Sequence, residues 1–364
     1  MNLIKTLNTS HRQPVHTGIL IVNLGTPNAP TPIAIRRYLA EFLWDYRVVE
    51  VPHMIWWLIL HGIILRLKPA RSARKYQAIW TPSGSPLLTI SKRQKNAIEV
   101  ALEKLYPAGS VKIALGMRYG TPSIAAALAE LRTAGVRKML ILPLYPQYSS
   151  TTTASTFDAV AAELRTWRLL PELRFISQYY ENSSYLNALA ESIRNASNEL
   201  SSDRLLFSFH GLPMRNVFAG DPYYCQCHKT ASLVAKILNL QSCKWSVSFQ
   251  SRFGYTKWLQ PHTSEVLTNW AKIGIETVDV ICPGFSADCL ETLEEIAIEN
   301  KKIFLNAGGK NYRYIPALND TPSHIAALTE LIRINTLGWL EFRLEDNNNS
   351  AKAENGDRET SNSA

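Results

Sequence analysis

One histidine stands at the end of an apolar run, where a ligand-binding side chain is often found. The run Leu205–Phe209 reads as a buried strand, and His210 follows it directly. Gly211 then allows a tight turn, and Pro213 ends any ladder pairing. An imidazole can take up a proton near neutral pH or bind a metal. The same position also suits a structural histidine, and the residues alone leave both interpretations open.

A row of carboxylates follows another strand-like run. After Pro283 and Gly284 the sequence predicts a helix, in which Glu291, Glu295 and Glu299 lie at i, i+4 and i+8, with Asp288 a turn earlier. A solvated acidic face is one interpretation, because the helix dipole favours acids in a first turn. A path for a divalent cation is the other, because carboxylate oxygens suit Mg²⁺, Mn²⁺ and Fe²⁺. Like charges at i and i+4 cost about 0.2–0.5 kcal/mol per pair. The helix dipole does not account for Glu299, which lies beyond the first turn.

Short apolar runs alternate with helical patterns along the chain, which is typical of a buried parallel sheet. The runs that predict strands are Gly18–Gly25, Val111–Gly116, Lys138–Tyr145, Leu205–Phe209, Trp245–Phe249, Val278–Cys282 and Ile303–Leu305. Segments such as Ile124–Leu131 and Tyr185–Leu200 predict helices between them. Loops after the carboxyl ends of such strands form the ligand site, so the histidine and the glutamates should meet there.

The two halves of the chain echo one another, which predicts two similar α/β domains. Leu24-Gly-Thr-Pro27 in the first half is matched by His210-Gly-Leu-Pro213 in the second. The predicted division is an N-terminal extension, a first domain, a second domain, a C-terminal helix and a polar tail. Their residue ranges are 1–17, 18–170, 171–324, 325–344 and 345–364. The tail has few apolar residues and is expected to be disordered.

The segment 53–67 is unusually apolar for a connection between strands. It contains Trp56, Trp57 and Leu60, yet it is too short to span a bilayer. A buried helix is one interpretation. An exposed lip for a flat hydrophobic ligand or for a membrane surface is the other.

Composition and charge narrow the class of protein. The chain has 364 residues, 46% of them hydrophobic, and a net charge of +9. A basic protein suits acidic small molecules, anionic lipid or nucleic acid. Binding of nucleic acid is not expected, because the sequence has no basic run interleaved with aromatic residues. Glycine-rich nucleotide-binding motifs are also missing from the sequence, which removes the usual routes to dinucleotide or ATP binding.

Cysteine content predicts a reducing, cytoplasmic environment. Five cysteines in a chain of this length do not make a disulfide framework, and the N-terminal residues lack the apolar core of a secretory signal. Cys225, Cys227 and Cys243 offer at most three thiolates in one region, whereas an iron–sulfur cluster usually needs four cysteines. Free thiols are therefore expected.

Seven blocks, in order along the chain, resemble the ferrochelatase family. They are Ile21–Pro27, Gly84–Pro86, Gly116–Gly120, Leu142–Tyr148, Phe207–Pro213, Phe249–Gly254 with Trp258, and Cys282–Glu295. The resemblance runs from about Thr17 to about Ile334. The last block and the Trp56–Trp57 pair look most like the proteobacterial branch. The resemblance implies insertion of Fe²⁺ into protoporphyrin IX, giving protohaem and two protons in the last step of haem synthesis. The implied fold has two Rossmann-like domains, each a four-stranded parallel sheet flanked by helices, with the active-site cleft between them.

The resemblance implies roles for individual residues of this chain. The resemblance implies that His210 and Glu291 contact the iron and handle the pyrrole protons, with a secondary metal site at Glu295 and Glu299. Leu24 stands where relatives carry a methionine or a tyrosine, and Cys289 stands where some carry a histidine. The remaining implied substrate contacts are Ser85, Arg118, Tyr119, Trp258, Trp56 and Trp57, together with an apolar contact from Leu24.

Iron enters as a substrate in this interpretation, and no permanently bound cofactor or iron–sulfur cluster is expected. The implied partners are protoporphyrin IX, Fe²⁺, an upstream enzyme that delivers the porphyrin, and the inner membrane as a peripheral contact. Two alternatives remain at this point. One is a tetrapyrrole carrier without catalysis, and the other is a chelatase for coproporphyrin III or for another metal.

Overall fold

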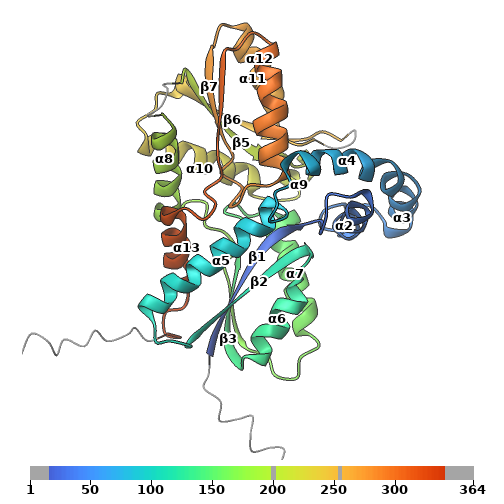
Figure 1. Ribbon diagram of the computed structural model, residues 1–364, viewed down its shortest axis with the longest axis vertical. Helices are drawn as coiled ribbons and strands as arrows, with labels where there is room; N and C mark the ends of the chain where they lie inside the picture. Colours follow the sequence, from blue (N-terminus) through green and yellow to red (C-terminus); the bar gives the residue numbers. More distant parts are fainter. Residues whose placement is uncertain (1–15, 198–201, 253–255, 341–364) are drawn as a thin grey trace, which may run out of the picture.

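Two four-stranded parallel sheets, one in each half of the chain, form the framework of the molecule (Figure 1). The computed structural model describes residues 16–197, 202–252 and 256–340. The strand orders are β2-β1-β3-β4 and β6-β5-β7-β8, so the first strand of each half lies inside its sheet. The first sheet contains β1 (His16–Thr26), β2 (Val111–Gly120), β3 (Val136–Pro143) and β4 (Glu172–Phe175). The second contains β5 (Arg204–His210), β6 (Trp245–Gln250), β7 (Thr277–Ile281) and β8 (Asn311–Ile315). The predicted α/β class with two four-stranded sheets is confirmed.

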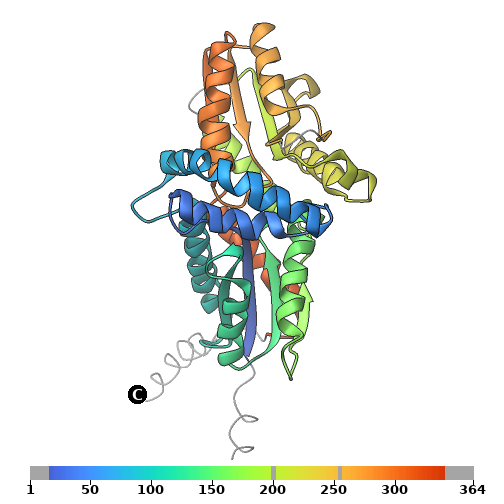
Figure 2. The same cartoon turned by 90° about the vertical axis from the view of Figure 1, so that its right-hand side faces the viewer.

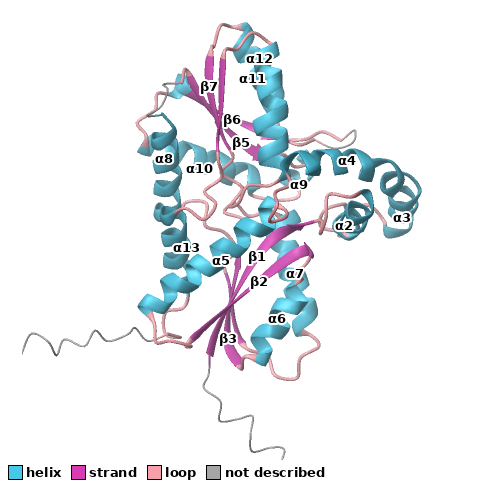
Figure 3. Cartoon of the chain, viewed as in Figure 1, coloured by secondary structure: helices cyan, strands magenta, loops and turns pink. Residues whose placement is uncertain are grey.

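Helices cover both faces of each sheet (Figure 3). In the first half they are α2 (Pro32–Trp44), α3 (His53–Ile59), η1 (Leu60–Ile64), α4 (Leu65–Ile79), α5 (Pro86–Leu105), α6 (Ile124–Thr133), η2 (Ser150–Ala154) and α7 (Ser155–Leu164). In the second half they are α8 (Ser183–Ser197), α9 (Met214–Phe218), α10 (Tyr223–Ile237), η3 (Ser242–Lys244), α11 (Thr263–Lys272), η4 (Glu291–Asn300), α12 (Lys301–Asn306) and α13 (Pro322–Asn335). Of these, η1, η2 and η4 are π-helices and η3 is a 3₁₀-helix.

One apolar cluster runs through both halves, because side chains from each sheet contribute to it. Ile19 and Ile21 of β1 belong to the same buried cluster as Phe207 and Phe209 of β5. These central strands are apolar on both faces because helices cover both sides, as parallel sheets require. The carboxyl ends of the two sets of strands point towards the junction between the halves (Figure 1). The segment α2–α4 lies beside that junction (Figure 2).

The structure corrects several predicted boundaries. Ile303–Leu305 lies in helix α12, and the strand of this region is β8. Only Phe304 of that run is fully buried, and a short apolar run does not separate strand from helix by periodicity. The first sheet takes its edge strand β4 from beyond residue 170, so the predicted division there is too early.

The predicted ends of the chain differ as well. Strand β1 already begins at His16, within the predicted extension 1–17. The C-terminal helix is α13, which begins at Pro322 and ends at Asn335 rather than spanning 325–344. The predicted polar tail, 345–364, lies outside the described residues.

Candidate active site

His210 is the last residue of β5, at the edge of the sheet that faces the junction. Its Nδ1 lies 2.7 Å from the carbonyl oxygen of Gly211. Because a carbonyl only accepts, Nδ1 carries a proton there, and the neutral form of the ring has its lone pair on Nε2. A Cβ at Gly211 would lie 2.9 Å from the Gln250 carbonyl oxygen and 3.3 Å from the Trp258 ring. The glycine is therefore required by close packing, and Trp258 packs on the turn after the histidine.

The side chain of Gln250, buried at the end of β6, ties the glutamate helix to the strand that carries His210. Its Nε2 donates to the carbonyl oxygen of Glu291 at 3.1 Å, where η4 begins. Its Oε1 accepts from Ser208 at 2.8 Å and from the Cys282 thiol at 3.5 Å. The second sheet thus fixes where η4 begins. A π-helix over these residues is itself unusual and is frequent at functional sites.

The carboxylate of Glu291 lies at the junction, near tyrosines of the first half. Burial raises the pKa of Tyr38 and Tyr76 well above the ordinary value, and the charge of Glu291 adds to both shifts. Burial likewise raises the pKa of the Cys289 thiol, with a further contribution from Glu291. Helices α2 and α4 and the loop before η4 therefore place neutral hydroxyl and thiol groups within electrostatic reach of Glu291.

Glu295 lies within electrostatic reach of His210 and is held by Ser251, which lies in the Phe249–Gly254 block but received no role from the sequence. The backbone N–H of Ser251 donates to Glu295 Oε1 at 2.8 Å, and the Ser251 hydroxyl donates to Oε2. Ser251 has φ of 60°, a conformation that non-glycine residues rarely adopt except where surrounding structure imposes it. Burial raises the pKa of Glu295, whereas the Ser251 hydrogen bonds and the charge of His210 oppose that rise.

The far end of the predicted carboxylate row pairs with a lysine. Lys75 Nζ on α4 lies 2.7 Å from Glu294 Oε2 and 2.8 Å from Glu299 Oε1. Glu295 and Glu299 therefore have different partners, Ser251 and Lys75. Within residues 16–197, 202–252 and 256–340, no group of three or more His, Cys, Asp or Glu side chains is placed to hold a metal ion.

Asp288 does not belong to the row, contrary to the sequence prediction. It precedes η4 and is buried, and Oδ1 accepts from Thr292 at 2.9 Å and from the Tyr314 hydroxyl at 2.6 Å. Oδ2 accepts from Asn319 at 2.8 Å. A carboxylate with this many donors is a structural anchor for the start of the helix.

Arg118 and Tyr119 lie at the end of β2 and share one carboxylate. Asp45 Oδ2 accepts from Arg118 Nη2 at 2.5 Å, from the Tyr119 hydroxyl at 2.8 Å and from Ser155 at 2.5 Å. Burial raises the pKa of Tyr119, so this phenol remains neutral and donates. Asp45, which terminates α2, is a residue that the sequence motifs missed, since nothing in its local pattern marks it.

Leu24 and Ser85 occupy the same junction from the first half. Leu24 packs in a cluster with Phe285 and Cys289 from the loop before η4, together with Leu87 and Ile90. The Ser85 hydroxyl lies 2.8 Å from that of Thr26, and both residues are buried. Side chains from the two halves therefore meet where the strands of each sheet end.

The two tryptophans of segment 53–67 have different environments. Trp56 is 6% exposed, packs with Leu60 and Leu65, and donates from its indole to the Leu43 carbonyl at 2.6 Å. It is a core residue of the helical segment, which corrects the prediction that it lines a lip. Trp57 is 51% exposed. No helix among the described residues is long and apolar enough to cross a membrane.

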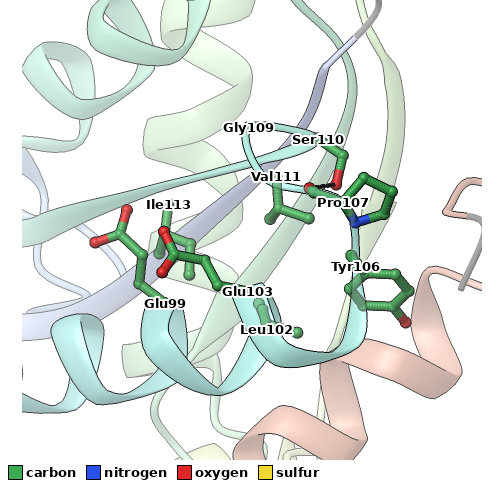
Figure 4. Close-up of a pocket in the computed structure, with 9 residues that line it drawn as sticks. All are labelled: Glu99, Leu102, Glu103, Tyr106, Pro107, Gly109, Ser110, Val111 and Ile113. Carbon is green, nitrogen blue, oxygen red and sulfur yellow. Dashed lines mark hydrogen bonds between the residues drawn. The ribbon is translucent and has the colours of Figure 1, made fainter. Parts of the chain in front are cut away.

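A separate small pocket lies away from this junction, where α5 meets the start of β2 (Figure 4). It is lined by Glu99, Leu102, Glu103, Tyr106, Pro107, Gly109, Ser110, Val111 and Ile113. Its volume is only ≈ 10 Å³, about the space of one water molecule. This pocket cannot hold an organic ligand and is not part of the candidate site.

The junction combines a base, carboxylates and apolar surface. His210 and Glu295 come from the second half, Arg118 and Tyr119 from the first, and Leu24 packs between the halves. Such a set can accept protons, offer oxygen and nitrogen ligands to a cation, and contact a flat apolar molecule.

Comparisons with known proteins show which family the chain is similar to. The ferrochelatase family model matches residues 16–336. The chain is 55% identical to a ferrochelatase of Nitrosococcus oceani over 92% of its length and 90% of the relative. It is 53% identical to a ferrochelatase of Thioalkalivibrio sulfidiphilus over 91% of its length and 90% of the relative. In fold it is similar to the sirohydrochlorin chelatase SirB of Bacillus subtilis subspecies spizizenii in complex with cobalt. That likeness has a TM-score of 0.51 at 12% identity, and it covers 90% of this chain and 100% of that one. The chain belongs to the ferrochelatase family.

Proposed function

We propose that this chain is the enzyme that inserts Fe²⁺ into protoporphyrin IX, releasing protohaem and two protons at the end of haem synthesis. The observation that supports the proposal is that the charges of His210 and Glu291 both act on the Glu295 carboxyl, in a chain whose two halves both lie within the family match. Metallation removes two protons from ring nitrogens, and an imidazole with its lone pair on Nε2 is a suitable acceptor. Iron is a substrate here, and the proposal includes no resident cofactor or iron–sulfur cluster.

The other site residues receive roles that fit their surroundings. Leu24 and Trp258 offer apolar contact to the macrocycle, and Arg118, whose guanidinium pairs with Asp45, is the proposed partner of a propionate. Glu291 takes part in proton removal or iron entry beside His210. The net charge of +9 favours approach of a dianionic porphyrin.

Anaerobic incubation with Fe²⁺ and protoporphyrin IX tests the proposal, with haem formation followed in the Soret and Q bands. Turnover should fall more than tenfold in His210→Ala, a loss above about 1.4 kcal/mol of barrier, while porphyrin binding is retained. His262→Ala, at the start of α11, is a matched control. A carrier would stop at one porphyrin per chain. If the chain metallates coproporphyrin III faster than protoporphyrin IX, or inserts Co²⁺ faster than Fe²⁺, the proposed substrate is wrong.

We further propose that an exposed apolar ridge on α3, η1 and α4 rests on an anionic membrane surface. The ridge residues are Ile55, Leu58, Ile59, Ile63 and Leu67, with Leu58 65% and Leu67 72% exposed. Arg66 and Arg71 are exposed on the same segment, and basic residues beside an apolar face favour anionic lipid. An upstream enzyme that delivers the porphyrin is proposed as a partner without an assigned surface.

Cosedimentation with phosphatidylglycerol vesicles tests the ridge. Leu58→Ser with Leu67→Ser should weaken binding, and Ile273→Ser, which removes an equally exposed apolar residue from another face, should not. Equal binding to phosphatidylcholine vesicles, or equal loss in the control, would contradict the proposal.

A further inference from the structure

Three aromatic rings are grouped on the surface between α2 and α3. The His53 ring lies 5.0 Å from that of Trp44 and 5.7 Å from that of Tyr46, both tilted by about 40°. Trp44 is 41% and Tyr46 is 55% exposed, and His53 is exposed as well. We call these three residues the His53 cluster. An imidazole that stays accessible between two exposed aromatic rings is not explained by burial of apolar surface.

The position of the His53 cluster connects it with the candidate site. Trp44 and Tyr46 flank Asp45, whose carboxylate holds Arg118 at 2.5 Å and Tyr119 at 2.8 Å. The cluster therefore lies one residue away in sequence from the carboxylate that holds Arg118, a proposed substrate contact.

The chemistry of the His53 cluster favours binding of the metallated product over the metal-free substrate. A histidine is a common axial ligand of haem iron, whereas metal-free porphyrin has no iron to bind. Exposed tryptophan and tyrosine rings offer flat apolar contact to a macrocycle. Both haem and porphyrin can stack on the rings, but only the metallated form gains a bond to an imidazole nitrogen.

We propose that His53 is a transient axial ligand for the haem product as it leaves, with Trp44 and Tyr46 contacting the macrocycle. One coordination bond forms between an imidazole nitrogen and the haem iron, and no electron or proton is transferred. This inference rests on the proposed function, because it takes haem as the product.

Titration of the full chain with ferric protohaem tests the inference. All variants are made in a His210→Ala background, so that the candidate active-site imidazole cannot ligate the iron. The parent should bind haem with the Soret shift of imidazole coordination, and His53→Ala should lose that signature and bind at least tenfold more weakly. Metal-free protoporphyrin IX should bind equally to both proteins.

His61→Ala is the matched control, because His61 also lies against a tryptophan of the same segment, with its ring 5.2 Å from that of Trp57. It should keep the coordination signature. Unchanged haem binding in His53→Ala, or equal loss in His61→Ala, would overturn the inference. If His53→Ala lowers the melting temperature, His53→Gln repeats the test with a polar side chain.

This titration does not use iron insertion, so the two proposals can fail separately. A chain that never metallates porphyrin but shows the His53-dependent signature would refute the proposed function and keep the haem site. Active iron insertion with no effect of His53 on haem binding would support the proposed function and refute the haem site.

Discussion

Lys75 Nζ lies 2.7 Å from Glu294 Oε2, which joins helix α4 of the first half to the π-helix η4 of the second. The Glu294 side chain is 10% exposed, so its carboxylate has little access to water. Lys75 also reaches Glu299. Burial lowers the pKa of its ammonium, but the hydrogen bonds and charges of Glu294 and Glu299 together outweigh that effect and raise it. One cation thus holds two acids of η4 and links the halves beside the candidate site.

Lys75→Met should lower the free energy of unfolding by about 1–3 kcal/mol, because a nearly buried carboxylate loses its partner. Urea denaturation measures the effect. Lys95→Met is the matched control, since Lys95 pairs with Glu99 one turn away on α5 and should contribute about 0.5 kcal/mol or less. Equal effects of the two substitutions would mean that the link between the halves contributes no more than a surface pair.

The strands that bear the site were predictable, because His210 and Arg118 follow or end long apolar runs. The edge strands β4 and β8 were not, since each is short and only partly buried. The π-helical turns of η4 could not be predicted from the sequence either, because its apolar spacing fits an α-helix equally well. Asp45 and Ser251 were missed for another reason: their partners are distant in the chain, and only the tertiary fold brings them together.

Trp56 and Trp57 are neighbours in sequence but should respond differently to substitution. Trp56→Ser removes a buried ring and an indole donor to Leu43, and should cost about 3–5 kcal/mol of stability. Trp57→Ser removes a half-exposed ring and should change the melting temperature little. Thermal melts of both variants decide the matter, and a large loss in Trp57→Ser would show that this ring is also part of the core.

His324 should make the fold sensitive to acid. Its ring is buried, Nδ1 donates to the Asn319 carbonyl at 2.6 Å, and Nε2 has no partner among the described residues. Burial lowers the pKa of His324 to about 4. The folded state therefore keeps the ring neutral, whereas the unfolded chain takes up a proton below about pH 6.5.

The contribution of His324 is fully present above pH 6.5 and is lost as the pH falls towards 4, by about 3 kcal/mol in total. Urea denaturation from pH 7.5 to 4 should show this loss, and His324→Gln should show a shallower dependence over the same window. Parallel curves for the two proteins would mean that the ring is protonated in the folded state as readily as in the unfolded chain.

Glu295 and Glu299 should affect iron use differently, because the structure gives them different partners. Glu295 lies near His210 and accepts from Ser251, whereas Glu299 pairs with Lys75 and its side chain is 44% exposed. A cation that approaches His210 is expected to use Glu295.

Glu295→Gln should therefore raise the Fe²⁺ concentration for half-maximal rate severalfold without changing porphyrin affinity. Glu299→Gln should superimpose on the parent, since Lys75 already pairs with that carboxylate. Iron titrations that superimpose for all three proteins would mean that neither glutamate lies on the route of the cation. An equal shift in Glu299→Gln would mean that the cation path extends along η4 in spite of Lys75.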